Sequence, residues 1–427
     1  MTKDLVKLLI VEYQRFVTKV DFIHRQVDFM NGQNYVLIGL RHAGKSYLMY
    51  QRIAELISQG HQPEEFLYFN FEDDRIDSLD ITDLELIKNC YEEMYDNRPV
   101  FFLDEVQQVK GWERFARRLA DQKYQVYITG SNAKMLSSEI ATTLGGRYLI
   151  QEVFPYSFAE YLMAHGIDIS EKNAEFKYRK QIVRAADEYF RKGGLPETAL
   201  MTDNRQWLSS LFNKIFFGDL VARHNVRNNF ALKILIRKLA ESVKQPISYS
   251  RMASIVSATG KRLSTDAAID YIQYMDESWL VLPYENFIGK LQDKEVNRKY
   301  YFIDNGLLAL FLIDPDSSLL ENIVAVNLRR RYGDNCYFYN ASKTEVDFYI
   351  PDESLAVQVS YSVTDKSTLK REVDGLIALS EFQNVQHLLI ITKDEDGTIE
   401  ANGKTISIIP LWKWMTDMET SKIRTGV

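Results

Sequence analysis

One octapeptide constrains the fold of this chain more than any other feature. It follows the pattern G-x-x-x-x-G-K-[ST] and lies between an apolar run at 35–38 and a helical pattern that starts near residue 47. A strand that turns through glycines into a helix directs several backbone N–H groups and the positive end of the helix dipole at one point. The pattern therefore predicts a polyphosphate site. The residues predicted to line it are Gly39, Leu40, Arg41, His42, Ala43, Gly44, Lys45 and Ser46.

An acidic pair after a second apolar run completes the predicted site. Asp104 follows the apolar residues 100–103, so we expect it at the end of a buried strand beside the octapeptide. There Asp104 and the Ser46 hydroxyl would hold Mg²⁺, and Lys45 would reach the β- and γ-phosphates. Glu105 would orient or deprotonate the attacking water. The alternative for an Asp-Glu pair taken alone is a solvated strand end.

Two further segments carry candidates for the same site. The apolar run 124–129 is followed by a glycine and two polar residues, and a side chain there can touch the γ-phosphate or the water. The candidates are Thr129, Ser131 and Asn132, which the sequence does not rank; a turn with a helix cap is the alternative. Arg147 follows two glycines and could stabilise phosphoryl charge, in cis or in a neighbouring copy. A surface arginine after a turn is the alternative.

Apolar runs and helical patterns alternate over the first part of the chain. After a helical pattern at 1–33, strands are expected at 35–39, 66–70, 99–103 and 124–129, and helices at 45–58, 81–95 and 112–121. This alternation predicts an α/β fold with a parallel sheet covered on both faces. No segment follows the guanine-specifying pattern N-K-x-D, so we expect ATP as the nucleotide.

Motifs along nearly the whole chain resemble the bacterial and archaeal AAA-type ATPases of the AAA_14 kind that carry a C-terminal DUF4143 region. The matching segments are 39–46, 68–73, 102–107, 129–132, 144–147, 154–158, 193–197, 301–307 and 320–322. The resemblance implies a P-loop ATPase domain with a helical lid, then a winged helix, then a fold like the restriction-endonuclease core. It also supports Arg147 as a finger or sensor.

The pattern of elements and this resemblance divide the chain into four expected parts. We expect an ATPase domain with an N-terminal helix at 1–153, a helical region at 154–230, a winged-helix-like domain at 231–290 and the DUF4143 or endonuclease-like domain at 291–427. The third helix of the winged helix carries acidic residues, although a helix that reads DNA is expected to be basic. Packing or protein interaction is therefore the favoured role for this part.

The expected endonuclease-like part departs from the pattern of active nucleases. Glu321 and Asp347 fit the metal-binding acids, but Gln358 replaces a carboxylate and Ser360 replaces the lysine that would stabilise developing charge. We therefore expect a degenerate domain without nuclease activity. Two lysines nearby in sequence could take over the missing role, namely Lys343 and Lys366.

The bulk composition limits the partners. Lys and Arg number 52 against 59 Asp and Glu, a net charge of −7, so the chain has no global basic character for nucleic acid. Two distant cysteines make no disulfide framework, and neither a signal peptide nor a membrane span is expected.

The sequence predicts a cytoplasmic, Mg²⁺-dependent ATPase that acts as a conformational switch for an unknown protein partner. The alternative is a DNA-associated ATPase or nuclease of mobile-element or defence type. A homo-oligomer is expected if Arg147 acts in trans.

Overall fold

The computed structural model describes residues 1–76, 79–130, 143–170, 174–290, 296–341 and 344–425. Its internal contacts divide the chain into two units, Met1–Phe154 and Pro155–Val427. The first unit ends one residue beyond the expected ATPase domain, whereas the three parts expected after it lie in one unit.

A parallel sheet of five strands forms the centre of the first unit, in the order β2-β3-β4-β1-β5. The strands are β1 (Asn34–Ile38), β2 (Phe66–Asn70), β3 (Val100–Asp104), β4 (Val126–Gly130) and β5 (Tyr148–Glu152). The first four lie where the apolar runs predict them, and β1 and β3 are buried at every position. The strands β3, β4 and β1 are parallel neighbours in this order. The residues at their carboxyl ends therefore lie close together at one edge of the sheet.

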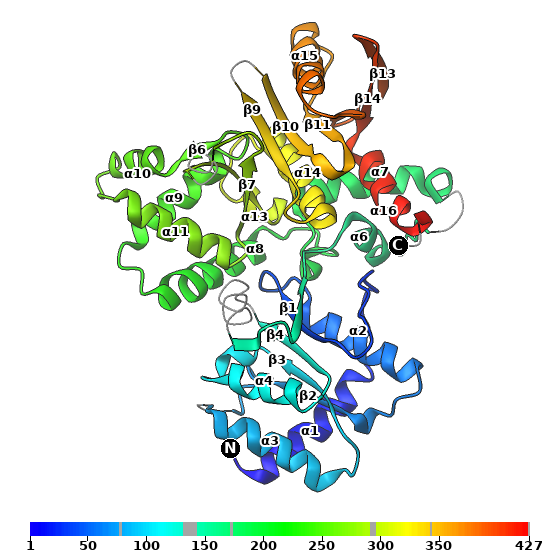
Figure 1. Cartoon of the computed structure of the whole chain (residues 1–427), viewed down its shortest axis with the longest axis vertical. Coiled ribbons are helices and arrows are strands. Elements are labelled where there is room, and N and C mark those ends of the chain that lie inside the picture. The colour runs from blue at the N-terminus through cyan, green and yellow to red at the C-terminus, as the bar shows by residue number, and fades with distance from the viewer. Residues whose placement is uncertain (77–78, 131–142, 171–173, 291–295, 342–343, 426–427) are drawn as a thin grey trace. The chain divides into compact units, whose positions relative to one another are not determined.

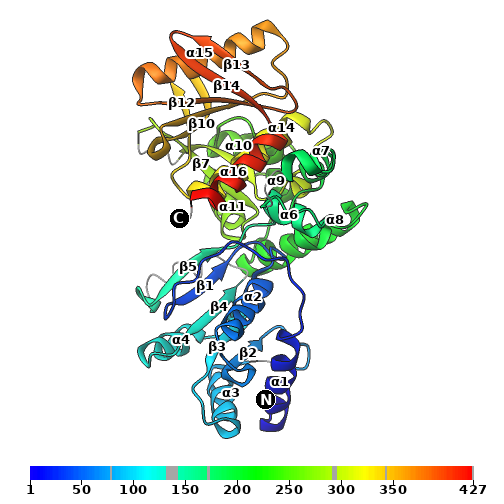
Figure 2. The same ribbon diagram turned by 90° about the vertical axis from the view of Figure 1, so that its right-hand side faces the viewer.

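Among the described residues of this unit, four α-helices accompany the sheet, and Figure 2 shows α2 and α4 on opposite sides of β4. The helices are α1 (Lys3–Val17), α2 (Lys45–Ser58), α3 (Ile81–Met94) and α4 (Trp112–Asp121), with 3-10 turns at Pro63–Glu65 and Val106–Gln108. The α/β prediction is confirmed for this unit, which has the fold of a P-loop NTPase.

The expected helix over 1–33 is too long, because α1 ends at Val17. The Thr18 hydroxyl bonds back to the carbonyls of Gln14 and Arg15, at 3.2 and 3.1 Å, and ends the helix. Beyond it, the backbone N–H and C=O of Arg25 bond to the Gln51 side chain, at 2.7 and 2.8 Å, instead of to helical neighbours.

A mixed sheet of nine strands forms the second unit, in the order β13-β14-β12-β11-β10-β9-β7-β8-β6 (Figure 1). The strands are β6 (Ile247–Ser248), β7 (Val281–Asn286), β8 (Asn297–Phe302), β9 (Tyr337–Ala341), β10 (Thr344–Ile350), β11 (Leu355–Val359), β12 (His387–Thr392), β13 (Gly397–Ala401) and β14 (Lys404–Pro410). The hairpin β13–β14 was not expected from the sequence.

Helices surround this second sheet. They are α6 (Phe158–Ala164), α7 (Ala174–Lys192), α8 (Arg205–Lys214), a π-helical turn (Ile215–Ala222), α9 (Asn229–Glu241), α10 (Tyr249–Ser257), α11 (Thr265–Glu277), α13 (Asn305–Ala309), α14 (Asp316–Tyr332), α15 (Lys366–Phe382) and α16 (Leu411–Thr425), with 3-10 turns at Pro196–Thr198 and Pro351–Glu353. Ser157 and Ser264 cap α6 and α11 through their side chains, as their positions before apolar runs predict.

The expected parts 231–290 and 291–427 are not separate in the structure. The first contains α9, β6, α10, α11 and β7 in that order, which are the elements that a winged helix requires, and the assignment stays a prediction. However, β7 pairs with β8 on one side and with β9 on the other, so one sheet runs through both parts.

Two segments that the resemblance singled out meet in the second unit. The buried Asp304 carboxylate accepts hydrogen bonds from the backbone N–H of Gly194 at 2.7 Å and of Leu307 at 3.1 Å. A Cβ at Gly193, where φ is +81°, would lie 2.2 Å from an Asp304 oxygen. Burial raises the pKa of Asp304 to about 6, although the backbone donors act in the opposite direction. These motifs therefore serve the packing of this unit.

No helix within the described ranges combines the length and the apolar character that a membrane crossing needs.

Candidate functional site

The loop after β1 needs glycine at two positions. Gly39 has φ +154°, and a Cβ there would lie 2.2 Å from the carbonyl oxygen of Val153, so the loop passes directly against the chain that follows β5. Gly44 precedes α2 in the left-handed region, with φ +95°. The first N–H groups of α2 have no partner within the helix, as at every helix start. The loop therefore has the geometry of an anion-binding helix start.

Lys45 is held inside this loop. Its side chain is buried, and Nζ donates to the carbonyl oxygens of Gly39 and Leu40, at 3.1 and 3.0 Å. The Oε1 atom of Glu105 lies 4.0 Å from Nζ. The ammonium group thus lies between the loop backbone and the acidic residue that follows β3.

Asp104 ends β3 with a buried side chain that three hydroxyl groups contact. Tyr68 donates to Oδ2 at 2.5 Å, Thr129 donates to Oδ1, and Ser46 also hydrogen bonds to the carboxylate. Burial, and then repulsion from Glu105, raises the pKa of Asp104 above its ordinary value. The structure therefore brings together the two residues predicted to hold Mg²⁺. A buried carboxylate beside a serine hydroxyl is a donor set that suits this ion.

Glu105 has a strained backbone. Its φ of +54° and ψ of +42° lie in the left-handed region, which costs a residue other than glycine on the order of 1 kcal/mol. Its backbone N–H donates to the Thr129 hydroxyl at 2.8 Å, and its side chain accepts from Gln107. These contacts hold the Glu105 carboxylate beside Lys45 and Asp104.

Among the three polar candidates after β4, the structure places Thr129 at the site. Its hydroxyl connects Asp104 with the backbone of Glu105. Ser131 and Asn132 lie outside the described residues. Thr129 is the last side chain of β4 before its terminal glycine.

Arg25 also contacts the loop, and no pattern in the sequence predicts this contact. Its side chain is buried, Nη1 donates to the carbonyl of Ala43 at 3.0 Å, and Nη2 donates to the carbonyl of Phe154 at 2.8 Å. One guanidinium group therefore ties the phosphate-binding loop to the last residue of the first unit. Arg25 stands in an irregular segment, where no periodic pattern marks it.

The structure does not place Arg147 beside the loop of its own chain. Arg147 directly precedes β5, and its carbonyl accepts from Asn34 at the start of β1, so it lies at the amino edge of a sheet whose carboxyl edge carries the loop. Its guanidinium pairs with Asp121 at 2.6 Å. A role in cis is thus excluded by strand direction, and only the role in trans remains a proposal.

The acidic residues after β2 have structural partners. Glu72 pairs with Arg41 of the loop at 3.4 Å and accepts from Gln108 at 3.1 Å. Asp73 accepts from the Tyr13 hydroxyl at 2.6 Å and pairs with Arg75, whose hydrogen bond lowers the pKa of Asp73. These contacts indicate that the acids stabilise the end of this strand.

The predicted acids of the second unit also meet, around a lysine that the sequence did not indicate. Glu321 and Asp347 both contact Lys299 at 3.2 Å. Gln358 bridges strands instead: it accepts from the backbone N–H of Asp347 at 2.9 Å and donates to the carbonyl of Glu345 at 3.0 Å. The hydroxyl of Ser360 donates to the carbonyl of Ser362. Of the two expected substitutes, Lys366 begins α15 and is exposed, and Lys343 lies outside the described residues.

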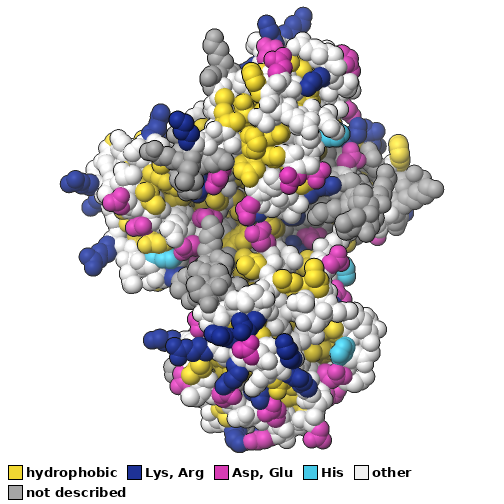
Figure 3. All heavy atoms as spheres, viewed as in Figure 1, with side chains coloured by type: hydrophobic (Ala, Val, Ile, Leu, Met, Phe, Trp, Pro, Cys, Tyr) yellow, Lys and Arg dark blue, Asp and Glu magenta, His cyan; other side chains and the backbone are white. Residues whose placement is uncertain are grey.

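The three consecutive arginines at the end of α14 serve internal contacts. Arg329 pairs with Asp334 at 2.8 Å, Arg330 donates to the carbonyl of Pro155 at 2.8 Å, and Arg331 donates to a carbonyl of α16 at 2.7 Å. On the face drawn in Figure 3, basic and acidic side chains are interspersed. Neither observation favours a DNA-binding stripe.

Comparison with known proteins identifies two regions. Residues 31–162 match a family described as an AAA domain (AAA_14), and residues 183–317 match a domain of unknown function, DUF8612. The expectation of a DUF4143 region is therefore wrong. The motifs of 193–197 and 301–307 that suggested it lie in the DUF8612 match, where they pack around Asp304.

Relatives and solved structures are also similar to this chain. An uncharacterized protein, MJ1544, of Methanocaldococcus jannaschii is 29% identical, over 96% of this chain and 95% of its own length. An uncharacterized protein of Haemophilus influenzae is 29% identical, over 89% and 93%. The Walker-type ATPase PABY2304 of Pyrococcus abyssi is 12% identical and has a TM-score of 0.37, over 65% of this chain and 90% of that one. DnaA of Aquifex aeolicus bound to AMPPCP is 13% identical and has a TM-score of 0.25, over 60% and 93%.

Proposed function

We propose that this protein binds and hydrolyses ATP in a Mg²⁺-dependent reaction and uses the cycle as a conformational switch for a protein partner. The observation that carries the proposal is the convergence of Lys45, Asp104 and Glu105 at one edge of the sheet. The match of this region to an AAA domain supports it. ATP is preferred to GTP because no guanine-specifying motif occurs in the sequence.

Each residue has a role that its geometry supports. The loop 39–46 would bind the phosphates through its backbone N–H groups and Lys45, while Ser46 and Asp104 would hold Mg²⁺. When bound, this ion neutralises charge on the phosphate oxygens. Glu105 would accept the proton of the attacking water, and Thr129 fixes the backbone from which Glu105 projects.

The contacts of Arg25 support the switch. The loop contacts Val153 through Gly39 and Phe154 through Arg25, and the second unit starts at the next residue. A change in the loop on hydrolysis would therefore reach the connection between the units by hydrogen bonds and direct contact. A bistable connection biased by the γ-phosphate is the general design of nucleotide switches.

The experiment that tests ATP binding compares K45A with K110A, which replaces an exposed lysine of the same unit. We expect K45A to lose binding of a fluorescent ATP analogue and K110A to retain it. Unimpaired binding by K45A would remove the basis of the nucleotide proposal.

The partner is best sought with a variant held in the ATP state. A pulldown with E105Q and ATP should retain a protein that K45A does not retain. Mixing the protein with a DNA duplex at low salt tests the alternative, since binding that weakens steeply with salt would favour the DNA-associated function over the protein switch.

Arg147 supplies a test of action between copies. If it stabilises phosphoryl charge in a neighbouring copy, R147A and K45A should each be inactive alone, and their mixture should recover turnover, because one copy supplies an intact loop and the other an intact arginine. A mixture that stays inactive contradicts the role in trans.

A further inference from the structure

A fully buried lysine lies within the acidic cluster of the second unit. Lys299, on β8, has no exposed side-chain surface. Its Nζ lies 3.2 Å from Oε1 of Glu321 on α14, 3.2 Å from Oδ1 of Asp347 on β10 and 3.7 Å from Oε1 of Glu345. Three carboxylates from two elements thus converge on one ammonium group.

The surrounding charges keep this ammonium protonated. Burial acts to lower the pKa of Lys299, but attraction by Glu321, Asp347 and Glu345 outweighs it and raises the pKa above its ordinary value. Burial raises the pKa of Glu321 above its ordinary value, and the positive charge of Lys299 opposes that rise. The Tyr301 hydroxyl donates to Glu321 at 2.7 Å and holds this carboxylate in place.

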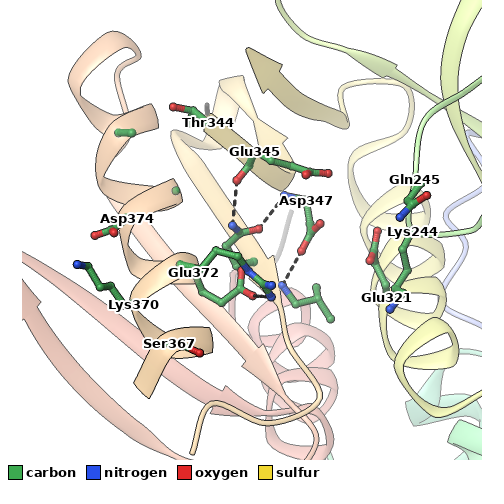
Figure 4. Close-up of a pocket in the computed structure, with 15 residues that line it drawn as sticks. Lys244, Gln245, Glu321, Thr344, Glu345, Asp347, Ser367, Lys370, Glu372 and Asp374 are labelled. Atoms are coloured by element: carbon green, nitrogen blue, oxygen red, sulfur yellow. Dashed lines mark hydrogen bonds and ion pairs between the residues drawn. The ribbon is translucent and has the colours of Figure 1, made fainter. Parts of the chain in front are cut away.

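The cluster forms one wall of a cavity of about 860 Å³ that Glu321, Glu345, Asp347 and Gln358 line. Figure 4 shows Glu321 on α14 across the cavity from Asp347 on β10. Lys299 already contacts one oxygen of Glu321 and one of Asp347, so a cation that enters from this side is repelled by the ammonium unless it displaces that group. Displacement would leave a charged lysine buried without its partners, which is strongly unfavourable.

We propose that the ammonium group of Lys299 occupies the place between Glu321 and Asp347 that a metal ion would take. The protein therefore binds no divalent metal there while Lys299 is in place. The inference goes beyond the proposed ATPase and does not depend on it.

The test measures Mn²⁺ binding to the nucleotide-free, full-length protein by the loss of the aqueous Mn²⁺ EPR signal. The variants are wild type, D347N, K299M, K299R and K299M/D347N; any binding at Asp104 is common to all of them and cancels. K299M removes the ammonium and keeps the carboxylates, and K299R keeps the positive charge.

We expect wild type, D347N and K299R to bind the same amount of Mn²⁺. K299M should take up an additional ion per chain, and K299M/D347N should lose it. Addition of Mn²⁺ should also raise the thermal midpoint of K299M but not that of K299R.

Either of two results would overturn the proposal. One is Mn²⁺ that wild type binds and D347N loses; the other is a folded K299M that binds no more Mn²⁺ than wild type. If K299M fails to fold, wild type and D347N decide the matter, since equal binding supports the proposal and a loss in D347N contradicts it.

Discussion

The Thr129 hydroxyl donates a hydrogen bond to Oδ1 of Asp104 and so joins the ends of the neighbouring strands β4 and β3. The Thr129 hydroxyl oxygen in turn accepts a hydrogen bond from the backbone N–H of Glu105. In T129V both bonds are lost at nearly constant volume, and we expect ATP turnover to fall at least about tenfold through misplacement of Glu105. T129S should recover most of the activity. Steady-state phosphate release measures both, and a fully active T129V would contradict the positioning role.

Substitution of Glu105 separates binding from hydrolysis. E105Q keeps the size of the side chain but cannot accept a proton, so turnover should fall by about 10²- to 10³-fold. Affinity for a fluorescent ATP analogue should stay within a few-fold, because Glu105 does not belong to the phosphate-binding loop. E113Q, in the first turn of α4, is the control and should leave both quantities unchanged. Normal turnover in E105Q would remove Glu105 as the base.

Removal of the Arg25 guanidinium leaves two carbonyl oxygens, those of Ala43 and Phe154, without their buried donor. Loss of a buried hydrogen-bond donor costs about 1–3 kcal/mol for each acceptor, so R25M should lower the free energy of unfolding by roughly 2–6 kcal/mol. It should also weaken ATP binding, although Arg25 lies behind the loop. Urea unfolding and nucleotide titration measure these effects, with R15M at an exposed position of α1 as the control. An R25M protein with wild-type stability would show that the bridge contributes nothing.

Alanine substitutions at two glycines with positive φ distinguish backbone strain from steric overlap of the added Cβ. At Gly39 a Cβ would lie 2.2 Å from the Val153 carbonyl, whereas at Gly60, with φ +104°, nothing lies within 4 Å. G60A should therefore cost about 1 kcal/mol, the conformational term alone. G39A must also move the backbone and should cost more than about 3 kcal/mol or prevent folding of the first unit. Thermal unfolding compares them, and similar losses for the two variants would contradict the close approach of the loop to Val153.

The raised pKa of Asp304 predicts how the free energy of unfolding changes with pH. Its pKa is about 6 in the folded protein against an ordinary value of 3.8, so between these pH values the folded state binds more protons than the unfolded state. Stability contributed by this group therefore falls as the pH rises from about 4 to about 6, by about 3 kcal/mol in total. D304N is expected to be less stable but to lack this slope. Urea unfolding of both proteins from pH 4 to 7 gives the difference, and identical slopes would exclude the raised pKa.

The first unit could be predicted from the sequence because its signals are local. The octapeptide and the apolar run before Asp104 each combine a strand with the residue that follows it, and parallel strands bring such residues to one edge. The position of Thr129 beside Asp104 follows from the same rule. The sequence could not predict the contact between Thr129 and Asp104 because it depends on the register between β3 and β4.

The features that the sequence could not predict have a common physical origin, because spacing along the chain does not give the direction of a strand or its distant neighbours. Arg147 follows a Gly-Gly turn, as a finger would, but the half-exposed β5 begins directly after it, so the turn lies at the edge of the sheet away from the loop of its own chain. Lys299 is part of Asn-Arg-Lys-Tyr, which is typical of a solvent-exposed strand, and only its neighbours on α14 and β10 make it buried. Arg25 is a lone arginine whose acceptors, Ala43 and Phe154, are distant in sequence.

The pairing of β7 with β9 has a consequence for how the chain can be cut. A fragment that ended near residue 290 would leave β7 without its partners on either side and expose an open row of backbone N–H and C=O groups. Such fragments self-associate, so the expected winged-helix part would aggregate when expressed alone. A cut in the exposed turn between β13 and β14 should be tolerated better, because it breaks no pairing within the sheet. An interaction screen should therefore use residues 155–427 as one fragment.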